Sequence, residues 1–458
     1  MRPTVALKSI NPTNGDLIRE YPEHSSHEVA EALTEARAAF EEWRGVSFAE
    51  RARPMQRAAA LLRERREDLA GLMALEMGKP VAQGRAEADK CAWVCEYYAD
   101  NAGRFLAPEE VASDATRSFV AFPPLGVVLA VMPWNFPLWQ VFRFVAPGLM
   151  AGNAAILKHA SNVSGCALAI EEILHGAGFS RALFRTLLVG SDRVGGLIEA
   201  PEVVGVTLTG STPAGKAVAA KAGSLLKKTV LELGGSDPYV VLEDADLEPA
   251  VEACVTSRLI NSGQSCIAAK RFIVVEPVRK RFESLFAEAM RTRRIGDPMT
   301  DVDLGPLARR DLRDELHRQV LRSVDRGAAA LVGGKLPDGP GAFYPPTVLT
   351  GVTKGMPAYD EEMFGPVAAV IGVADEDEAV RVANDSSFGL GAAVFTRDAA
   401  RGERLAAQRL EAGSCFVNSF VKSDPRLPFG GIKESGYGRE LSSFGIREFV
   451  NIKTVYVK

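Results

Sequence analysis

The residue type best suited to covalent chemistry in this sequence is a cysteine in a short polar turn. Cys266 ends the run Gly-Gln-Ser-Cys at positions 263–266, which follows a stretch with helical spacing. The thiolate is the reactive form, so the ordinary thiol pKa of about 8.5 must be lowered, or a base must lie nearby, for attack at neutral pH. A lone cysteine is more often inert, and the other five are expected to pack as small core residues. Context alone makes Cys266 the candidate nucleophile.

Two polar residues follow predicted strands. Glu232 closes a buried strand and precedes an apolar residue and two glycines, a place where a carboxylate is rare without a partner. It is either a general base whose pKa is raised by apolar surroundings or a structural acid bound to loop amides. Asn135 lies between Pro133 and Pro137, after the predicted strand over 127–132. Its amide either donates to a developing oxyanion or braces the turn.

A glycine-containing turn over 210–217 offers a candidate phosphate site. It is not a Walker A loop, because Ala217 stands where that motif needs Ser or Thr. It also lacks the dinucleotide fingerprint Gly-x-Gly-x-x-Gly, because position 212 is Thr. What remains is a strand, a turn and a helix whose first amides could bind a pyrophosphate, or an ordinary strand-to-helix turn.

The pattern of apolar residues predicts an α/β scaffold for these turns. The first hundred residues read as helices, with capping boxes at Ser25 and Ser47. From residue 127, short β-rich runs alternate with helical stretches, which indicates βαβ units and a parallel nucleotide-binding sheet. The alternation resumes after residue 237, so a second α/β domain is expected. Extended stretches over 118–122 and 454–458 lie outside both predicted sheets and could pair with another subunit's edge.

Composition and charge exclude several classes of protein. Hydrophobic residues make up 47% and charged residues 24% of the 458, which is typical of a folded, water-soluble chain. The net charge of −4, without a strongly basic segment, predicts no nucleic-acid partner. Prolines and an arginine interrupt the most apolar stretch, residues 119–152, so no membrane span of about 20 apolar residues is expected.

Cysteine and histidine usage bears on metals and on the compartment. Six cysteines are too sparse and irregular for a disulfide framework, and none of the five histidines pairs with them at zinc-binding spacing. We therefore expect no metal. The start of the sequence lacks the apolar core of a signal peptide, and together with the cysteine count this predicts a reducing, cytoplasmic location.

Six blocks of sequence carry a resemblance to the aldehyde dehydrogenase superfamily, in that family's order and over nearly the whole chain. They are PWNFP at 133–137, LTGS at 208–211, LELGG at 231–235, GQSC at 263–266, EEMFGPV at 361–367 and PFGGIKESGYGRE at 428–440. The resemblance implies an α/β fold with a Rossmann-type dinucleotide-binding domain, a second α/β domain and a small oligomerisation extension. We assign residues 1–112 and 125–234 to the first, 235–440 to the catalytic domain, and 113–124 and 441–458 to the extension. A homodimer or homotetramer is implied as well.

The same resemblance gives the candidate residues their roles. It implies that Cys266 attacks the aldehyde, that Asn135 and the Cys266 backbone N–H hold the oxyanion, and that Glu232 activates water for deacylation. Such a reaction is the NAD(P)-dependent oxidation of an aldehyde to a carboxylate through a thiohemiacetal and a thioester. A transfer of the thioester to coenzyme A is disfavoured, because a water-activating base favours hydrolysis.

Cofactor contacts are also implied by the motifs rather than by spacing. The matched positions are Trp134, Lys158, Gly210, Ser211, Glu362 and Phe364. Members that prefer NAD usually carry a Glu three residues after the lysine, where it bonds the adenosine 2′-hydroxyl; this chain has Ser161. Without that negative charge a 2′-phosphate is not repelled, so we expect NADP to be preferred and NAD use to stay possible.

For the substrate, the chain resembles the bacterial succinate-semialdehyde dehydrogenase branch of the family. Arg143 matches an arginine that binds the substrate carboxylate there, although an interdomain role is the alternative. A second such arginine is replaced by Ile260, for which Arg258 or Arg426 could substitute. Oxidation of another short aliphatic or phosphorylated aldehyde is the alternative activity, and a non-catalytic dinucleotide-binding protein is a more distant one.

Overall fold

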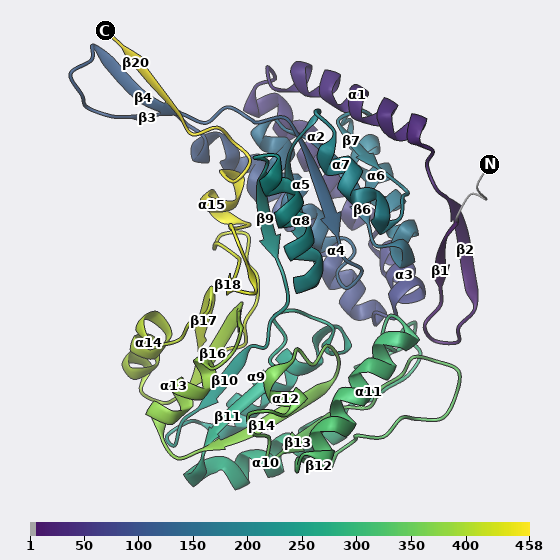
Figure 1. The fold of residues 1–458 in the computed structure, drawn as a ribbon, viewed down its shortest axis with the longest axis vertical. Helices are drawn as coiled ribbons and strands as arrows, with labels where there is room; N and C mark the ends of the chain where they lie inside the picture. The colour runs from purple at the N-terminus through teal and green to yellow at the C-terminus, as the bar shows by residue number, and fades with distance from the viewer. Residues whose placement is uncertain (1–5) are drawn as a thin grey trace.

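The computed structural model describes residues 6–458, which form two stacked α/β units and a projecting arm (Figure 1). The chain starts with an antiparallel hairpin, β1 (Ala6–Ile10) and β2 (Leu17–Pro22), where the sequence analysis predicted helices. That prediction was wrong because five of the six side chains of β2 are exposed, which hides the alternation of a half-buried strand. The hairpin turn reaches the second unit, where the Ala342 N–H donates to the Pro12 carbonyl at 2.8 Å.

Four helices follow the hairpin: α1 (Ser26–Trp43), α2 (Phe48–Glu64), α3 (Arg66–Met77) and α4 (Val81–Phe105). Both predicted capping boxes are confirmed, at Ser25 with Glu28 and at Ser47 with Glu50. Helix α4 is the longest of them at 25 residues, and it packs on α2, α3 and α5 (Trp139–Ala151).

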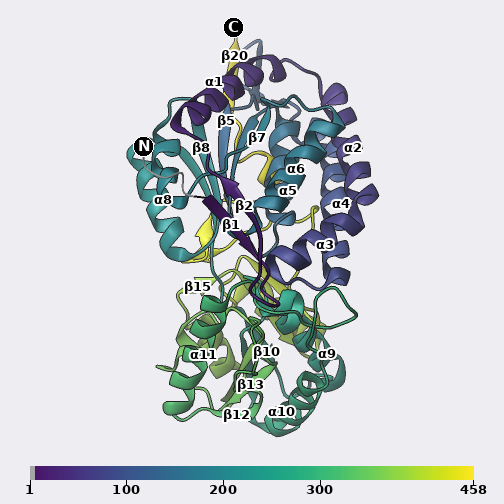
Figure 2. The same ribbon diagram turned by 90° about the vertical axis from the view of Figure 1, so that its right-hand side faces the viewer.

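The first sheet has the strand order β19-β9-β8-β5-β6-β7. All its strands but β19 are parallel, as predicted: β5 (Val127–Met132), β6 (Ala154–His159), β7 (Phe184–Thr186), β8 (Val203–Thr209) and β9 (Lys228–Glu232). Helices α6 (Ser164–Ala177), α7 (Val194–Glu199) and α8 (Thr212–Ser224) complete the crossovers. Figure 2 shows the strands between α8 on one side and α2 and α4 on the other. The edge strand β19 (Gly436–Tyr437) pairs antiparallel with β9 and comes from within the range assigned to the second domain.

The second sheet has the order β12-β13-β14-β11-β10-β16-β17 and is parallel except at β12. Its strands are β10 (Pro238–Val241), β11 (Arg271–Val275), β12 (Ala329–Val332), β13 (Thr347–Thr350), β14 (Val367–Val373), β16 (Gly391–Phe395) and β17 (Ser414–Val417). The helices around it are α9 (Leu247–Leu259), α10 (Glu276–Arg291), α11 (Arg310–Asp325), α12 (Pro357–Asp360), α13 (Glu376–Asn384) and α14 (Ala399–Gln408).

Both faces of this second sheet are buried. Along β11, Ile273 packs in one apolar cluster while Phe272 and Val274 pack in the other, as the two-residue period of a strand requires. An unbroken apolar run such as β11 is the sequence signal of a strand covered on both sides, which is why it could be predicted. The α/β fold class is thus confirmed for both units.

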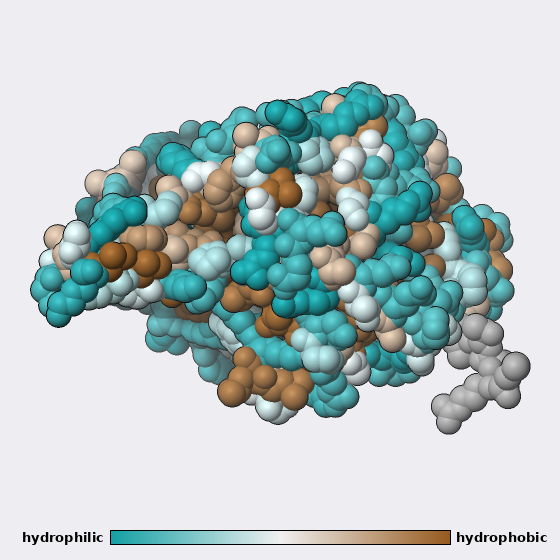
Figure 3. Space-filling model, turned by 90° about the horizontal axis from the view of Figure 1, so that it is seen from above, coloured by the Kyte–Doolittle hydropathy of each residue, from teal (hydrophilic) through white to brown (hydrophobic). Residues whose placement is uncertain are grey.

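The projecting arm is a three-stranded sheet of β3 (Glu109–Glu110), β4 (Arg117–Ala121) and β20 (Lys453–Val457) (Figure 1). The two stretches that the sequence analysis placed outside both sheets pair here with each other. Ile452, Tyr456 and Val457 remain exposed on the arm, and Figure 3 shows apolar side chains among polar ones there. Three short elements precede β20: β15 (Phe388–Gly389), β18 (Ile432–Lys433) and α15 (Ser442–Ile446). Within residues 6–458, no helix is long and apolar enough to cross a membrane.

Candidate active site

The turn that carries Cys266 is held in an unusual backbone conformation. After α9, three consecutive residues have positive φ: Asn261 at 55°, Ser262 at 54° and Gly263 at 76°. Only glycine adopts such values readily, so the surroundings must hold the other two in place. Asn261 Nδ2 donates to the Asn135 carbonyl at 2.7 Å, and Ser262 Oγ exchanges hydrogen bonds with Gly305 across the buried loop.

Lys270 holds the backbone of Cys266 in place through hydrogen bonds. Its buried ammonium donates to the carbonyls of Ser265 at 2.8 Å and Cys266 at 2.6 Å, and it forms an ion pair with Glu362 at 3.3 Å. Because β11 begins one residue later, the lysine anchors the turn to the start of the central strand of the second sheet. The nucleophile therefore rests on a rigid strand although it lies in a loop.

The thiol of Cys266 is half-buried, and burial raises its pKa to about 12. The nearby charges of Arg143 and Lys270 favour the thiolate, while those of Glu362 and Asp237 oppose it, and together they do not offset the desolvation. In the protein without ligands, the sulfur is therefore a protonated thiol at neutral pH. Attack on a carbonyl requires that this proton leave first.

Asn135 lies beside the thiol turn, as its predicted role requires. The side chain is buried, and Nδ2 donates to the Gln264 carbonyl at 3.1 Å, two residues before Cys266. The loop after β5 thus meets the loop before β11, one from each unit. The oxyanion role itself stays a prediction; this geometry brings an amide donor to the turn where the oxyanion would form.

Glu232 is buried at the end of β9, and neither carboxylate oxygen has a hydrogen-bond partner among residues 6–458. Burial raises its pKa well above the ordinary value, and the charge of Glu440 adds to this effect, whereas Arg143 lowers the pKa. A carboxyl without protein partners is free to bond a water, as a general base must. Gly430, at φ 153°, leaves room for it: a Cβ there would lie 2.7 Å from Glu232 Oε1.

Arg143 lies at the candidate site, but its charge is already compensated. The guanidinium is buried on α5 and forms an ion pair with Glu440, which the sequence analysis missed. It also donates to Thr209 Oγ1 at 3.3 Å and lies over the Phe429 ring, 4.6 Å from the centroid. Carboxylate binding by Arg143 stays a prediction that must be weighed against this existing partner.

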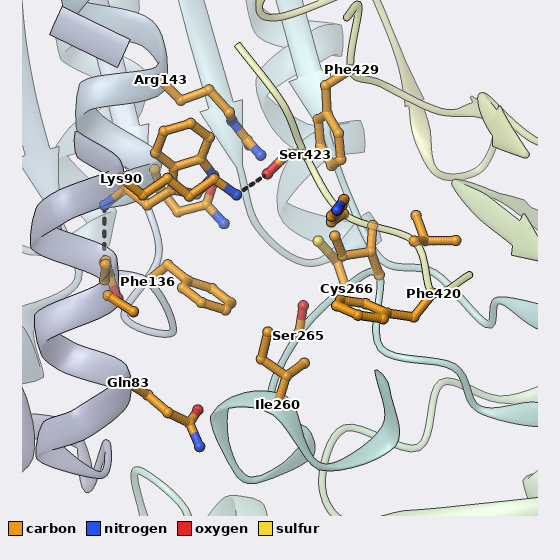
Figure 4. Close-up of a pocket in the computed structure, with 17 residues that line it drawn as sticks. Gln83, Lys90, Phe136, Arg143, Ile260, Ser265, Cys266, Phe420, Ser423 and Phe429 are labelled. Atoms are coloured by element: carbon orange, nitrogen blue, oxygen red, sulfur yellow. Dashed lines mark hydrogen bonds between the residues drawn. The ribbon is translucent and has the colours of Figure 1, made fainter. Parts of the chain in front are cut away.

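A cavity of about 190 Å³ opens between the two units in front of Cys266 (Figure 4). This volume is below the roughly 300–1,000 Å³ of sites for drug-sized ligands, so the cavity suits a small substrate. Its wall is mainly apolar, and it includes Phe136, Trp139, Ile260, Ile267, Phe420 and Phe429. Its polar groups include Lys90, Arg143, Ser265 and Ser423.

Neither of the two arginines considered as substitutes at position 260 reaches this cavity wall. Arg258 is fully buried and donates to the carbonyls of Gly263 at 2.6 Å and Val367 at 3.2 Å, so it holds the turn. Arg426 is exposed and forms an ion pair with Asp424 at 2.6 Å. Lys90 was not singled out from the sequence, although Gln83, Glu87 and Lys90 share the spacing of one helix face.

The predicted cofactor residues gather where the first sheet meets the second unit. Lys158 is the penultimate residue of β6; its buried side chain forms no hydrogen bond or ion pair within residues 6–458, and burial lowers its pKa. Ser161 is exposed just beyond it. Gly210 and Ser211 precede α8, and Ser211 makes no side-chain cap bond, so the first amides of this 13-residue helix stay open to an anion.

Two further predicted cofactor residues come from the loop before β14. Glu362 accepts a hydrogen bond from the Gly235 N–H at 3.1 Å besides pairing with Lys270. The ring of Phe364 meets that of Trp134 edge to face, with centroids 5.7 Å apart. An unpaired buried ammonium, open helix amides and half-exposed rings together fit a dinucleotide, so these residues would hold one. No group of three metal-ligating side chains occurs over residues 6–458.

Comparisons with known proteins agree with this fold. A model of the aldehyde dehydrogenase family matches residues 2–455. A Synechocystis protein named "Probable succinate-semialdehyde dehydrogenase", NADP+-linked by name, is 49% identical over 99% of this chain and 100% of its own. The succinate-semialdehyde dehydrogenase 1 of Mycobacterium tuberculosis, also named for NADP+, is 49% identical over 98% of this chain and 99% of its own.

A solved structure agrees as well. The succinic semialdehyde dehydrogenase of Streptococcus pyogenes in complex with NADP+ has a TM-score of 0.96 and 38% identity, covering 99% of this chain and 100% of that one. The chain therefore belongs to the aldehyde dehydrogenase family. This confirms the resemblance drawn from the six sequence blocks.

The raised pKa of Cys266 predicts how the free protein reacts with an alkylating agent. Only the thiolate reacts, so the rate of iodoacetamide labelling at Cys266 should rise about tenfold per pH unit from pH 7 to pH 10. Mass spectrometry of the Cys266 peptide gives the rate. A rate that levels off below pH 8 would contradict the protonated thiol described above.

Proposed function

We propose that this protein oxidises succinate semialdehyde to succinate and prefers NADP+ as the hydride acceptor. The observation that carries the proposal is the junction of the Cys266 turn with the Asn135 amide, at the end of a small apolar cavity that also holds cations. The names of the relatives at 49% identity support the substrate and the cofactor. The size of the cavity and its buried positive groups support a short aldehyde that bears a carboxylate.

The reaction begins with covalent capture of the aldehyde. Cys266 loses its proton to water and its sulfur bonds the carbonyl carbon, while the π electrons of the C=O bond move to the oxygen, which gains the negative charge. In this proposal the Asn135 side-chain N–H and the Cys266 backbone N–H donate to that oxygen, and the support is that Asn135 Nδ2 lies at the Cys266 turn, where it donates to the Gln264 carbonyl. A bound nicotinamide cofactor would supply the acceptor for the hydride that the carbonyl carbon loses. That loss leaves the acyl group bound to the sulfur as a thioester.

Glu232 then serves the hydrolysis of the thioester. Its unpartnered carboxylate takes a proton from water, the hydroxyl bonds the acyl carbon, and the sulfur leaves as the thiolate. The raised pKa of Glu232 makes this carboxylate a stronger base than an exposed one. Arg143, between Glu440 and the thiol turn, limits that rise because its positive charge favours the ionised carboxylate.

NADP+ preference rests on the end of β6. Lys158 offers an unpaired ammonium, and Ser161 places a small neutral hydroxyl where a carboxylate would repel a 2′-phosphate. NAD+ lacks that phosphate, so its binding is less sensitive to this position. Use of NAD+ as a poorer acceptor is therefore part of the proposal.

Removal of the nucleophile tests the proposed chemistry. Cys266→Ala should lower kcat by about 10³-fold or more, because no other group can carry the acyl intermediate. The measurement is the absorbance of the reduced cofactor formed with succinate semialdehyde. Cys415→Ala, at a half-buried cysteine on β17, is the matched control and should keep near wild-type activity. Equal activity of the two variants would refute the mechanism.

A charge placed at position 161 tests the cofactor preference. Ser161→Glu should weaken NADPH binding by about tenfold or more through repulsion of the 2′-phosphate and leave NADH binding unchanged or tighter. Fluorescence titration of each reduced cofactor gives the Kd. Ser161→Gln introduces a side chain of the same shape as glutamate but without the charge, and it should bind both cofactors much as the wild type does. If Ser161→Glu and Ser161→Gln weaken NADPH binding equally, the cause is the size of the new side chain and not its charge.

We also propose that the arm joins copies of this chain into a dimer or tetramer in the cytoplasm. The arm leaves a short sheet with exposed apolar residues, and sparse unbridged cysteines suit a reducing compartment. Deletion of residues 453–458, which removes β20, should reduce the molar mass measured by light scattering after size exclusion. A wild-type protein that runs as a monomer at micromolar concentration would refute the oligomer.

A further inference from the structure

The substrate cavity contains a half-buried cation, Lys90, that forms no ion pair among residues 6–458. Lys90 projects from α4 into the cavity, and Nζ donates to Ser423 Oγ at 2.7 Å (Figure 4). The ammonium also lies over the Trp139 ring, 4.3 Å from its centroid. Within residues 6–458, Lys90 forms no ion pair, whereas Arg143 in the same wall is paired with Glu440.

An ammonium in such a place is short of negative charge. A neutral hydroxyl and an aromatic face offset only part of the cost of taking a cation out of water. Burial accordingly lowers the pKa of Lys90 to about 8. A bound carboxylate would supply the missing counter-charge through a charge-assisted hydrogen bond.

We propose that Lys90 is the residue that selects an aldehyde with a distal carboxylate, by binding that carboxylate at the end of the cavity opposite the reacting carbonyl. The inference rests on the proposed function and names the group that gives it its specificity. Ser423 presents a second donor beside Lys90, and Phe136 and Trp139 contact the methylenes between the two ends. Ile260 replaces the second carboxylate-binding arginine that the resemblance implied. In this proposal Lys90 on α4 supplies the positive charge instead.

The other cations near the cavity are less suited to this task. Lys422 lines it but is exposed, so its attraction for an anion is weakened by water. Arg426 is exposed and paired with Asp424, and Arg258 is used by backbone carbonyls. Arg143 can still add to the field in the cavity, but its own ion pair would have to rearrange to bind a substrate directly.

Substrate pairs separate charge recognition from catalysis. Succinate semialdehyde and butanal have the same number of carbons, and only the first bears a carboxylate. Lys90→Met should raise the KM for succinate semialdehyde about 10- to 100-fold and leave kcat/KM for butanal within about twofold. Lys90→Arg keeps a charge and should retain much of the preference. Lys422→Met is the matched control at the exposed lysine and should change the ratio of kcat/KM values little.

The outcomes distinguish the two proposals. If wild-type protein prefers succinate semialdehyde and Lys90→Met keeps that preference, the proposed function stands and the role of Lys90 is refuted. If Lys90→Met impairs both substrates equally, the lysine is structural, and the inference again fails. If wild-type protein shows no preference for the carboxylate, the proposed substrate is wrong and the inference falls with it. Competitive inhibition by succinate, lost in Lys90→Met, gives a readout without turnover.

The pH profile provides a second test that a structural role would not satisfy. The charge of Lys90 is lost as pH rises through about 8; Arg143 on α5 favours that loss, while Glu87 and Cys91 on α4 and Asp424 in the loop after β17 oppose it. The ratio of kcat/KM for succinate semialdehyde to that for butanal should therefore fall above pH 8 in wild-type protein. In Lys90→Arg the ratio should stay flat to pH 10. A ratio independent of pH in wild-type protein would refute the assignment.

Discussion

The site depends on one contact between the two units, the hydrogen bonds from Asn261 and Asn135 that join their loops. Asn261 Nδ2 holds the Asn135 carbonyl, and Asn135 Nδ2 holds the Gln264 carbonyl. Lys270 and Arg258 hold the Cys266 turn within its own unit, and the bonds with Asn135 add the restraint from the other unit on a turn with left-handed residues. The contact brings the Asn135 amide to the turn that carries Cys266, which is the arrangement that the proposed oxyanion stabilisation requires.

Charge compensation is the second constraint, because the site collects several ionisable groups away from water. Lys270 is paired with Glu362, and Arg143 with Glu440. Each pair satisfies groups whose isolated burial would be costly. Glu232 remains unpaired, and its raised pKa is the direct consequence. Burial and the charge of Glu440 raise the pKa of Glu232, and burial raises the pKa of Glu440 as well, but only Glu232 has both oxygens without an ion-pair partner among residues 6–458 and so keeps them for a water.

Much of the fold could be predicted from sequence because its signals are local. The capping boxes of α1 and α2 and the unbroken apolar run of β11 need no knowledge of distant residues. Strand β2 could not be recognised, since its mostly exposed side chains carry no alternation. Cys266, Glu232 and Asn135 were found because their motifs stand at strand or turn boundaries. Glu440 was missed because its partner Arg143 is far away in the sequence, and Lys270 because its bonds to the Ser265 and Cys266 carbonyls depend on the folded shape of the turn.

The comparison of Arg143 with Lys90 explains why a motif match does not by itself assign a binding group. Both cations line the cavity, and the sequence favours the arginine, whose position follows a recognised block. Whether a cation can bind the substrate carboxylate, however, depends on whether another group already pairs with its charge. Glu440 is about 300 residues from Arg143 in the sequence, so the ion pair between them forms only in the folded chain and cannot be predicted from a local motif. Lys90 lies within a helix and carries no motif, yet folding leaves its ammonium facing the cavity with a hydroxyl as its hydrogen-bond partner. An anionic substrate gains more from the cation whose charge is still uncompensated.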